Sequence, residues 1–299
     1  MFPRFRRSTA GTSALLLLAA TLSVASAATA AATPAPDELC GPGSAIHYNA
    51  SDFTQPTKIS NKWLPLKPGM QYTTTGTVTS EDGVHAHSVV HTVTGLSKVI
   101  DGVTTRVLWD RDYQDGQLQE SELAFFAQSR QGAVWLFGEY PEEYENGTLV
   151  GAPSTFIHGL AKAQAGTAMP ARPSLTAPDH VQAYAPKVDF LDCGSVFQKH
   201  QRVCVPTGCY DDVLVIDEYN PLEPPDAGHQ RKFYSAGTGL VKVTAVGGPD
   251  QEFMDLVSIR TLTAAQLDQV NAQALEIDAR GYKVSRSVYA KTAPATVGP

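Results

Sequence analysis

The 299-residue sequence lacks several motifs that would point to a particular function. It has no Gly-x-Ser-x-Gly segment and no glycine-rich phosphate loop, so neither a nucleophile elbow nor a nucleotide site can be recognised. Only four cysteines occur and none forms a C-x-x-C pair, which argues against a zinc site built from cysteine. The apolar run Ala14–Val24 is too short to span a bilayer, and no later segment is apolar enough to cross a membrane. A functional site must therefore be assembled from residues that are distant in the sequence.

Basic residues are also scarce, with 23 Lys and Arg against 30 Asp and Glu, which gives a formal net charge of −7. Nucleic acids and anionic lipids select proteins with a basic surface. We therefore expect neither as the main partner, and the dispersed acidic charge mainly favours solubility.

The N-terminus has the layout of a secretory signal peptide, predicted over residues 1–27. Three arginines within the first seven residues precede the apolar run Ala14–Val24, and small residues follow it. A twin-arginine signal at Arg6-Arg7 is an alternative, although the apolar residues that usually follow such a pair are missing. Cys40 lies too far beyond the apolar run for a lipoprotein. Removal of this signal peptide would change the formal charge from −7 to −10. The signal-peptide layout predicts a secreted protein.

Four cysteines in an exported protein favour disulfides. Cys204 and Cys209 bracket a plausible hairpin turn and can face each other across two strands. Cys40 and Cys193 would then tie the mature N-terminus to the second half of the chain. The other two pairings, and four unpaired thiols, stay open.

An internal duplication is indicated by two stretches separated by about a hundred residues. Arg106–Tyr113 aligns with Asp212–Tyr219, and Phe125–Ala127 aligns with Phe233–Ser235. A glycine-containing turn and an apolar run follow in each copy, at Ala133–Phe137 and Leu240–Val246. We therefore predict that one β unit occurs twice.

Short segments rich in β-branched and aromatic residues alternate with turn residues along both copies, which is typical of an antiparallel meander. In the first copy the predicted strands are Tyr72–Thr79, Val84–Thr94, Lys98–Ile100, Thr104–Arg111, Leu118–Gln128, Ala133–Gly138 and Thr148–Val150; in the second they are Lys187–Phe190, Ser195–Val205, Tyr210–Tyr219, Gln230–Ala236 and Leu240–Val246. The fold class is mainly β. The duplicated meander is expected to form one barrel or two packed curved sheets.

One C-terminal helix is predicted after the second copy. Thr263–Gln266 fits a capping box, and Leu267, Val270, Ala274 and Ile277 fall on one face before Gly281, the expected stop. We expect this helix to close an open end of the sheet and Ser285–Pro299 to be a tail. The predicted organisation is a signal peptide (1–27), a flexible N-terminal segment (28–60), a first β repeat (61–159), a second β repeat (160–250) and a C-terminal helix with its tail (251–299), the repeats forming one structural domain.

Three histidines share one face of a predicted strand, because alternate residues of a strand point the same way. His85 and His87 lie about 6–7 Å apart at their Cα atoms on this geometry, close enough to share a metal ion such as Zn or Cu. His91 is on the same face, and His229 comes just before the matching strand of the second copy. The candidate metal ligands are therefore His85, His87, His91 and His229, against the alternative of an exposed histidine-rich strand.

Three carboxylates are candidate catalytic residues. Asp110 and Asp112 share one strand face, and Glu139 follows the apolar run Val134–Gly138. A pair of carboxylates from different strands can carry out glycoside hydrolysis without leaving a local motif. Taken alone, each residue is better explained as a solvated or capping residue, and Asp-Arg-Asp also occurs as ordinary surface charge alternation.

Several motifs together resemble a group of exported bacterial β proteins of uncharacterised function. They are Trp63–Gly69, Phe125–Gln128, Val134–Glu139, Met169–Pro173 and Lys232–Val241. The resemblance covers most of residues 61–246 and implies an extracytoplasmic setting. It also implies that His91 and His229 stand where the group usually has histidine, whereas His85, His87 and the cysteine pair are peculiar to this chain.

The leading hypothesis is a secreted, non-catalytic β-sheet binding protein with a small ligand or metal ion held between the two repeats. The first alternative is an extracellular hydrolase or isomerase that acts through Glu139, Asp110 or His229, and these side chains should then converge in one pocket. The second is a structural cell-envelope protein, which predicts a broad exposed apolar patch in place of a pocket.

Overall fold

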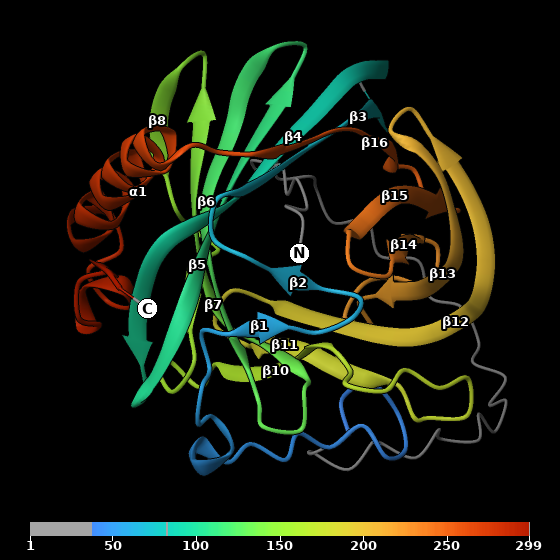
Figure 1. The fold of residues 1–299 in the computed structure, drawn as a ribbon, viewed down its shortest axis with the longest axis horizontal. Helices are drawn as coiled ribbons and strands as arrows, with labels where there is room; N and C mark the ends of the chain where they lie inside the picture. The colour runs from blue at the N-terminus through green and yellow to red at the C-terminus, as the bar shows by residue number, and fades with distance from the viewer. Residues whose placement is uncertain (1–37, 82, 299) are drawn as a thin grey trace, which may run out of the picture.

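The computed structural model describes residues 38–81 and 83–298, and its main body is a closed antiparallel barrel of 12 strands (Figure 1). Strands β3 to β7 follow one another around the ring, and β10 to β16 complete it by pairing β10 with β7 and β16 with β3. The strands are β3 (Met70–Ser80), β4 (Gly83–Ile100), β5 (Val103–Gln114), β6 (Gln117–Gln128), β7 (Val134–Glu145), β10 (Gln164–Met169), β11 (His180–Ala185), β12 (Phe190–Val205), β13 (Gly208–Tyr219), β14 (His229–Ser235), β15 (Gly239–Val246) and β16 (Gln251–Thr261). The predicted mainly β class is confirmed, and the barrel is the form adopted.

The two aligned stretches occupy matching places in this barrel. β5, β6 and β7 form a meander in one half, and β13, β14 and β15 form a meander in the other. Trp109 and Val215 each lie in the first strand of their set of three. The common origin of the halves stays a prediction, but both line a single interior.

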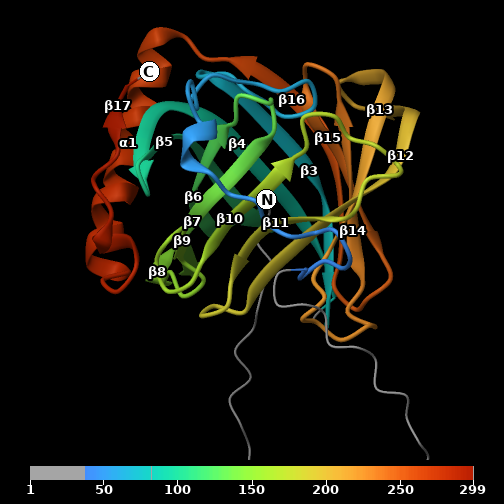
Figure 2. The same ribbon diagram turned by 90° about the horizontal axis from the view of Figure 1, so that it is seen from below.

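Helix α1 (Ala264–Val284) lies on the outside of the barrel, beside β4 to β7 (Figure 2). Its predicted capping box is present, with the Thr263 side chain accepting from the Gln266 backbone N–H. Ala274 and Ile277 pack against outward-facing Phe125 and Tyr140. The expectation that the helix closes an end of the sheet is therefore wrong, because its apolar face matches the apolar outer wall.

Gly281 does not stop the helix, which continues to Val284. A Cβ atom at this position would meet Tyr289 Cδ1 at 2.5 Å. The glycine is thus needed for close packing of the segment that follows. That segment is also more than a tail, since η2 (Tyr289–Lys291) packs on the helix and β17 (Thr296–Val297) pairs with β4.

The N-terminal part is folded over residues 38–60, where a flexible segment was expected; the predicted signal peptide lies outside the described residues. It contains η1 (Ala50–Asp52) and β1 (Ile59–Ser60), which pairs with β2 (Pro65–Leu66). Ile59, Trp63 and Leu66 are buried among residues of the barrel interior. The β1–β2 hairpin therefore fills one end of the barrel, as Figure 1 shows.

The four cysteines form two disulfides, Cys40–Cys193 and Cys204–Cys209, as the preferred pairing predicted. Disulfides persist in oxidising compartments, and the predicted extracytoplasmic location is confirmed. No helix among the described residues is long and apolar enough to span a membrane.

Two short strands complete the fold, β8 (Thr148–Gly151) and β9 (Phe156–Ile157), both paired with β7.

Candidate functional site

The inner wall of β4, β5 and β6 changes from apolar to acidic along the strands. Directly paired residues share a face, and the registers give three successive rows across these strands. They are Val93–Leu108–Ala124, then His91–Asp110–Glu122, then Val89–Asp112–Glu120. The first row packs with the β1–β2 hairpin. The wall is therefore apolar beside the hairpin and rich in carboxyl side chains farther along the barrel.

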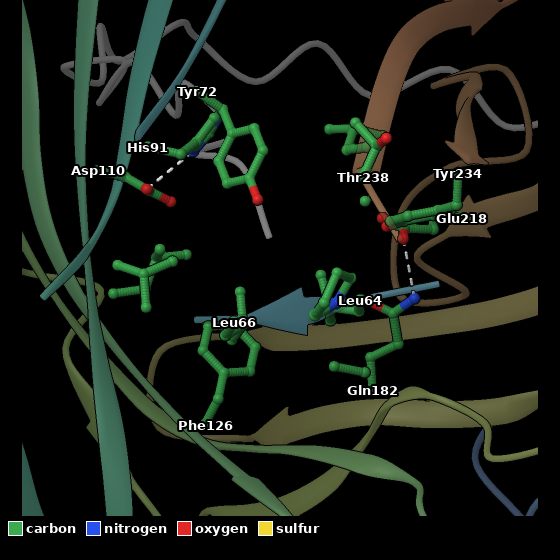
Figure 3. A pocket seen from close by; sticks show the side chains of 16 residues that line it. Leu64, Leu66, Tyr72, His91, Asp110, Phe126, Gln182, Glu218, Tyr234 and Thr238 are labelled. Carbon is green, nitrogen blue, oxygen red and sulfur yellow. Dashed lines mark hydrogen bonds and ion pairs between the residues drawn. The ribbon is translucent and has the colours of Figure 1, made fainter. Parts of the chain in front are cut away.

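A cavity of about 80 Å³ lies where these two environments meet. One water molecule needs about 10–15 Å³ on this scale, so the cavity has room for several waters or a slender organic molecule. Its walls come from both halves, with Tyr72, His91 and Asp110 facing Gln182, Glu218 and Tyr234 across the space, and Leu66 and Phe126 on another side (Figure 3).

In the second half of the barrel, the buried carboxylate of Glu218 has both a cationic partner and a hydrogen-bond donor. It forms an ion pair with Lys232 and accepts a hydrogen bond from Gln182 Nε2 at 2.9 Å. Burial alone would raise the pKa of Glu218, but the Lys232 charge and the Gln182 hydrogen bond outweigh it and lower the pKa. This part of the wall therefore carries a charge that its neighbours stabilise.

On the first half, the acidic side chains face one another. Glu122 is opposite Asp110 and Glu120 is opposite Asp112, and Glu139 of β7 is opposite Ala124. Burial raises the pKa of both Glu120 and Glu122 well above the usual range, and the neighbouring carboxylates raise it further. Burial, with the charges of Asp192 and Asp110, raises the pKa of Glu139 to about 8. The protein thus holds these groups near the protonated state at neutral pH.

Two of the predicted metal ligands are inside the barrel, each bound to a carboxylate. His87 lies between Asp112 Oδ1 at 2.7 Å and Glu252 Oε1 at 3.1 Å, and His91 Nδ1 is 2.7 Å from Asp110 Oδ1. Burial lowers the pKa of His87, but these two carboxylates outweigh it and raise the pKa to about 10. An imidazolium is a poor metal ligand, because the metal needs the neutral ring.

The other two predicted ligands lie elsewhere. His85 is at the barrel rim, paired with Asp115 at 2.7 Å. His229 pairs with Asp217 at 2.9 Å on the outer face, because its neighbour Gln230 points inward and bonds Glu252. Among residues 38–81 and 83–298, no group of three or more His, Cys, Asp or Glu side chains is arranged to hold a metal ion.

All three predicted catalytic carboxylates, Asp110, Asp112 and Glu139, belong to the inner wall. Asp110 lines the cavity, and its charge raises the pKa of Glu139. His229, on the outer face, cannot join them. The combination of Glu139, Asp110 and His229 expected for a hydrolase is therefore not assembled.

Sequence reasoning missed Glu120, Glu122, Glu218 and Glu252. The first two were within reach of it, because the Asp115-Gly116 turn fixes the register that places them opposite Asp112 and Asp110. Glu252 and Glu218 come from strands far along the chain, and only closure of the barrel brings them to the same interior.

No protein-family model matches the chain, and no curated protein matches it. Among solved structures, it is similar to a Bacteroides fragilis NCTC 9343 protein named as a predicted exported protein with a YmcC-like fold, at 16% identity and a TM-score of 0.39. It is also similar to a predicted lipoprotein from Parabacteroides distasonis ATCC 8503, at 11% identity and a TM-score of 0.35. Each match covers 67% of this chain and 99% of the other. Both scores are below 0.5, and neither likeness bears on the site. The chain is an exported β-barrel protein with an acidic interior.

Proposed function

We propose that this exported protein binds a small, partly apolar molecule inside its barrel, between the two halves. The observation that carries the proposal is the cavity, whose walls combine apolar side chains with convergent polar groups from both halves. A mixed apolar and polar lining of this kind is typical of small-ligand sites, and a volume of about 80 Å³ suits only a small guest. The exposed large apolar residues are scattered over strands and loops, for example Val84, Leu175 and Leu222, which favours a binding role over a structural one.

Ligand-observed NMR would test this proposal. Saturation-transfer spectra are recorded with short-chain alcohols, amines, carboxylic acids and sugars against the purified protein. The matched variants are Ala168→Phe, which fills the cavity, and Ala264→Phe at the exposed start of α1. At least one class should give signals that Ala168→Phe abolishes and Ala264→Phe preserves. Equal signals from both variants would show that binding occurs elsewhere and would refute the proposal.

A hydrolase is the second candidate, favoured by one observation. Glu139, with its pKa raised to about 8, would be protonated at neutral pH and could act as a general acid beside Asp110. A screen of chromogenic glycosides and esters tests it. Turnover lost in Glu139→Gln and retained in Asp268→Asn, an exposed acid of α1, supports it; no turnover of any substrate rejects it.

A further inference from the structure

We infer that the molecule held in the barrel is a small organic cation, an ammonium group on a short apolar body. The inference rests on the proposed function and names the ligand class of the same site. Three observations support it: the charge balance of the inner wall, carboxylate oxygens without hydrogen-bond donors, and the apolar wall beside them.

Carboxyl groups outnumber cations on the inner wall among the described residues. The buried acids are Asp110, Asp112, Glu120, Glu122, Glu139, Asp192, Glu218 and Glu252. The basic groups that face them are the buried His87, His91 and Lys232 and the partly buried His180. Of these, His180 is neutral, because burial lowers its pKa to about 4, and Lys232 is engaged with Glu218. Several of these acids are protonated at neutral pH because of that imbalance. A positively charged guest would stabilise their ionised forms, and an anion would not.

Several of these acids have an oxygen that receives no hydrogen bond from the described residues. They are Asp110 Oδ2, Asp112 Oδ2, Glu122 Oε1 and Glu139 Oε1. Each side chain is at most 5% exposed, and Asp110 lines the cavity. Buried acceptors without donors are costly and uncommon. An ammonium group supplies three donors and a positive charge, which is what this part of the wall lacks.

The apolar side of the cavity indicates an organic cation. Leu66, Val93, Leu108 and Phe126 line it directly beside Asp110. Burial of a methylene group against such a wall contributes about 0.8 kcal/mol, which a bare metal ion or a fully polar cation would forgo. The site is therefore suited to a molecule with one charged end and one apolar end.

Three probes of equal chain length separate charge from shape: hexylammonium, hexanol and hexanoate. Isothermal titration calorimetry of the full exported protein should give hexylammonium an affinity at least tenfold above that of hexanol, with no binding of hexanoate. Hexylammonium should also release protons near pH 7, seen as a dependence of the heat on the buffer, because a nearby cation lowers the pKa of the protonated carboxyls. Hexanol should release none.

Substitutions at single residues test which side chains bind the ammonium group. Asp110→Asn and, independently, Glu122→Gln should weaken hexylammonium binding about tenfold and leave hexanol unchanged, whereas Asp268→Asn on the exposed face of α1 should change neither. Tighter binding of hexanol or hexanoate than of hexylammonium overturns the inference and leaves the proposed function standing. Binding of none of the three overturns the inference, and the saturation-transfer screen with the wider set of ligands then decides the proposed function. Stoichiometric uptake of ZnCl2 or CuCl2 that displaces hexylammonium would identify a metal site and also overturn the inference.

Discussion

The barrel interior contains two buried acidic regions that differ in how their charge is balanced. Around Glu218, the Lys232 ammonium and the Gln182 amide satisfy the carboxylate, and its pKa is lowered. Around Glu122, carboxylates face one another and the pKa is raised. Both regions are equally sheltered from water, so the difference comes from partners and not from burial.

This comparison separates a structural role from a binding role. A satisfied network holds strands together and has no unused hydrogen-bonding capacity. A region with unpaired acceptors costs stability, and such sites are common where proteins bind or react. Four predictions test the difference.

The largest effect is expected at the satisfied region. Lys232→Met leaves Glu218 buried without its cation and should lower the free energy of unfolding by about 3–5 kcal/mol. Lys242→Met is the control, since it removes a half-exposed pair with Asp255 and should cost at most about 1 kcal/mol. Urea denaturation at pH 7 measures both. A loss from Lys232→Met no larger than that of the control would contradict the comparison.

The second prediction concerns the pH dependence of stability. The pKa of Glu139 is raised from 4.5 to about 8 in the folded state, so between these values the folded protein holds a proton that the unfolded chain releases. Its contribution to stability is complete below pH 4.5 and is lost as pH rises toward 8, by up to about 1.4 kcal/mol per pH unit. Glu139→Gln should flatten this decline in urea midpoints measured from pH 5 to 8. An unchanged slope would place the pKa of Glu139 in its ordinary range.

Replacement of an unbalanced acid should stabilise the protein. Glu122→Gln replaces an acid that must take up a proton on folding at pH 8 with a neutral amide, and it should raise the free energy of unfolding by about 1 kcal/mol at that pH. Gln230→Glu, which adds an acid opposite Glu218, is the reciprocal change and should destabilise. Thermal denaturation at pH 8 compares them. Destabilisation by Glu122→Gln would mean that Glu122 has a structural partner like that of Glu218.

The smallest effect is expected at the rim. His85 lies on the same strand face as His87, but it pairs with an exposed aspartate, Asp115. Solvent screens such a pair, so His85→Gln should leave the urea midpoint unchanged within error. His87→Gln, in the buried network, should lower it clearly. Equal losses from the two variants would show that burial does not control the strength of these pairs.

Local patterns in the sequence predicted the strands, the Thr263 cap and the Cys204–Cys209 disulfide, because each depends on neighbours in the chain or on a short turn. The Cys40–Cys193 disulfide then followed as the remaining pair. The same reasoning placed Asp110, Asp112 and His91 on one face of their strands. It failed for α1, because the surface that a helix covers is set by the partner wall and not by the helix. It failed for His229, because one residue of register moves a side chain to the opposite face of a strand.

The sequence by itself determined that the protein is acidic and built from antiparallel β strands and predicted its export, since charge, composition and alternation are local properties. Only the tertiary structure decided that the acids of β5, β6 and β7 would share one interior with Glu218 and Glu252. The physical reason is that a pKa, an unpaired oxygen and a cavity depend on distances between side chains, and those distances are fixed only when the barrel closes.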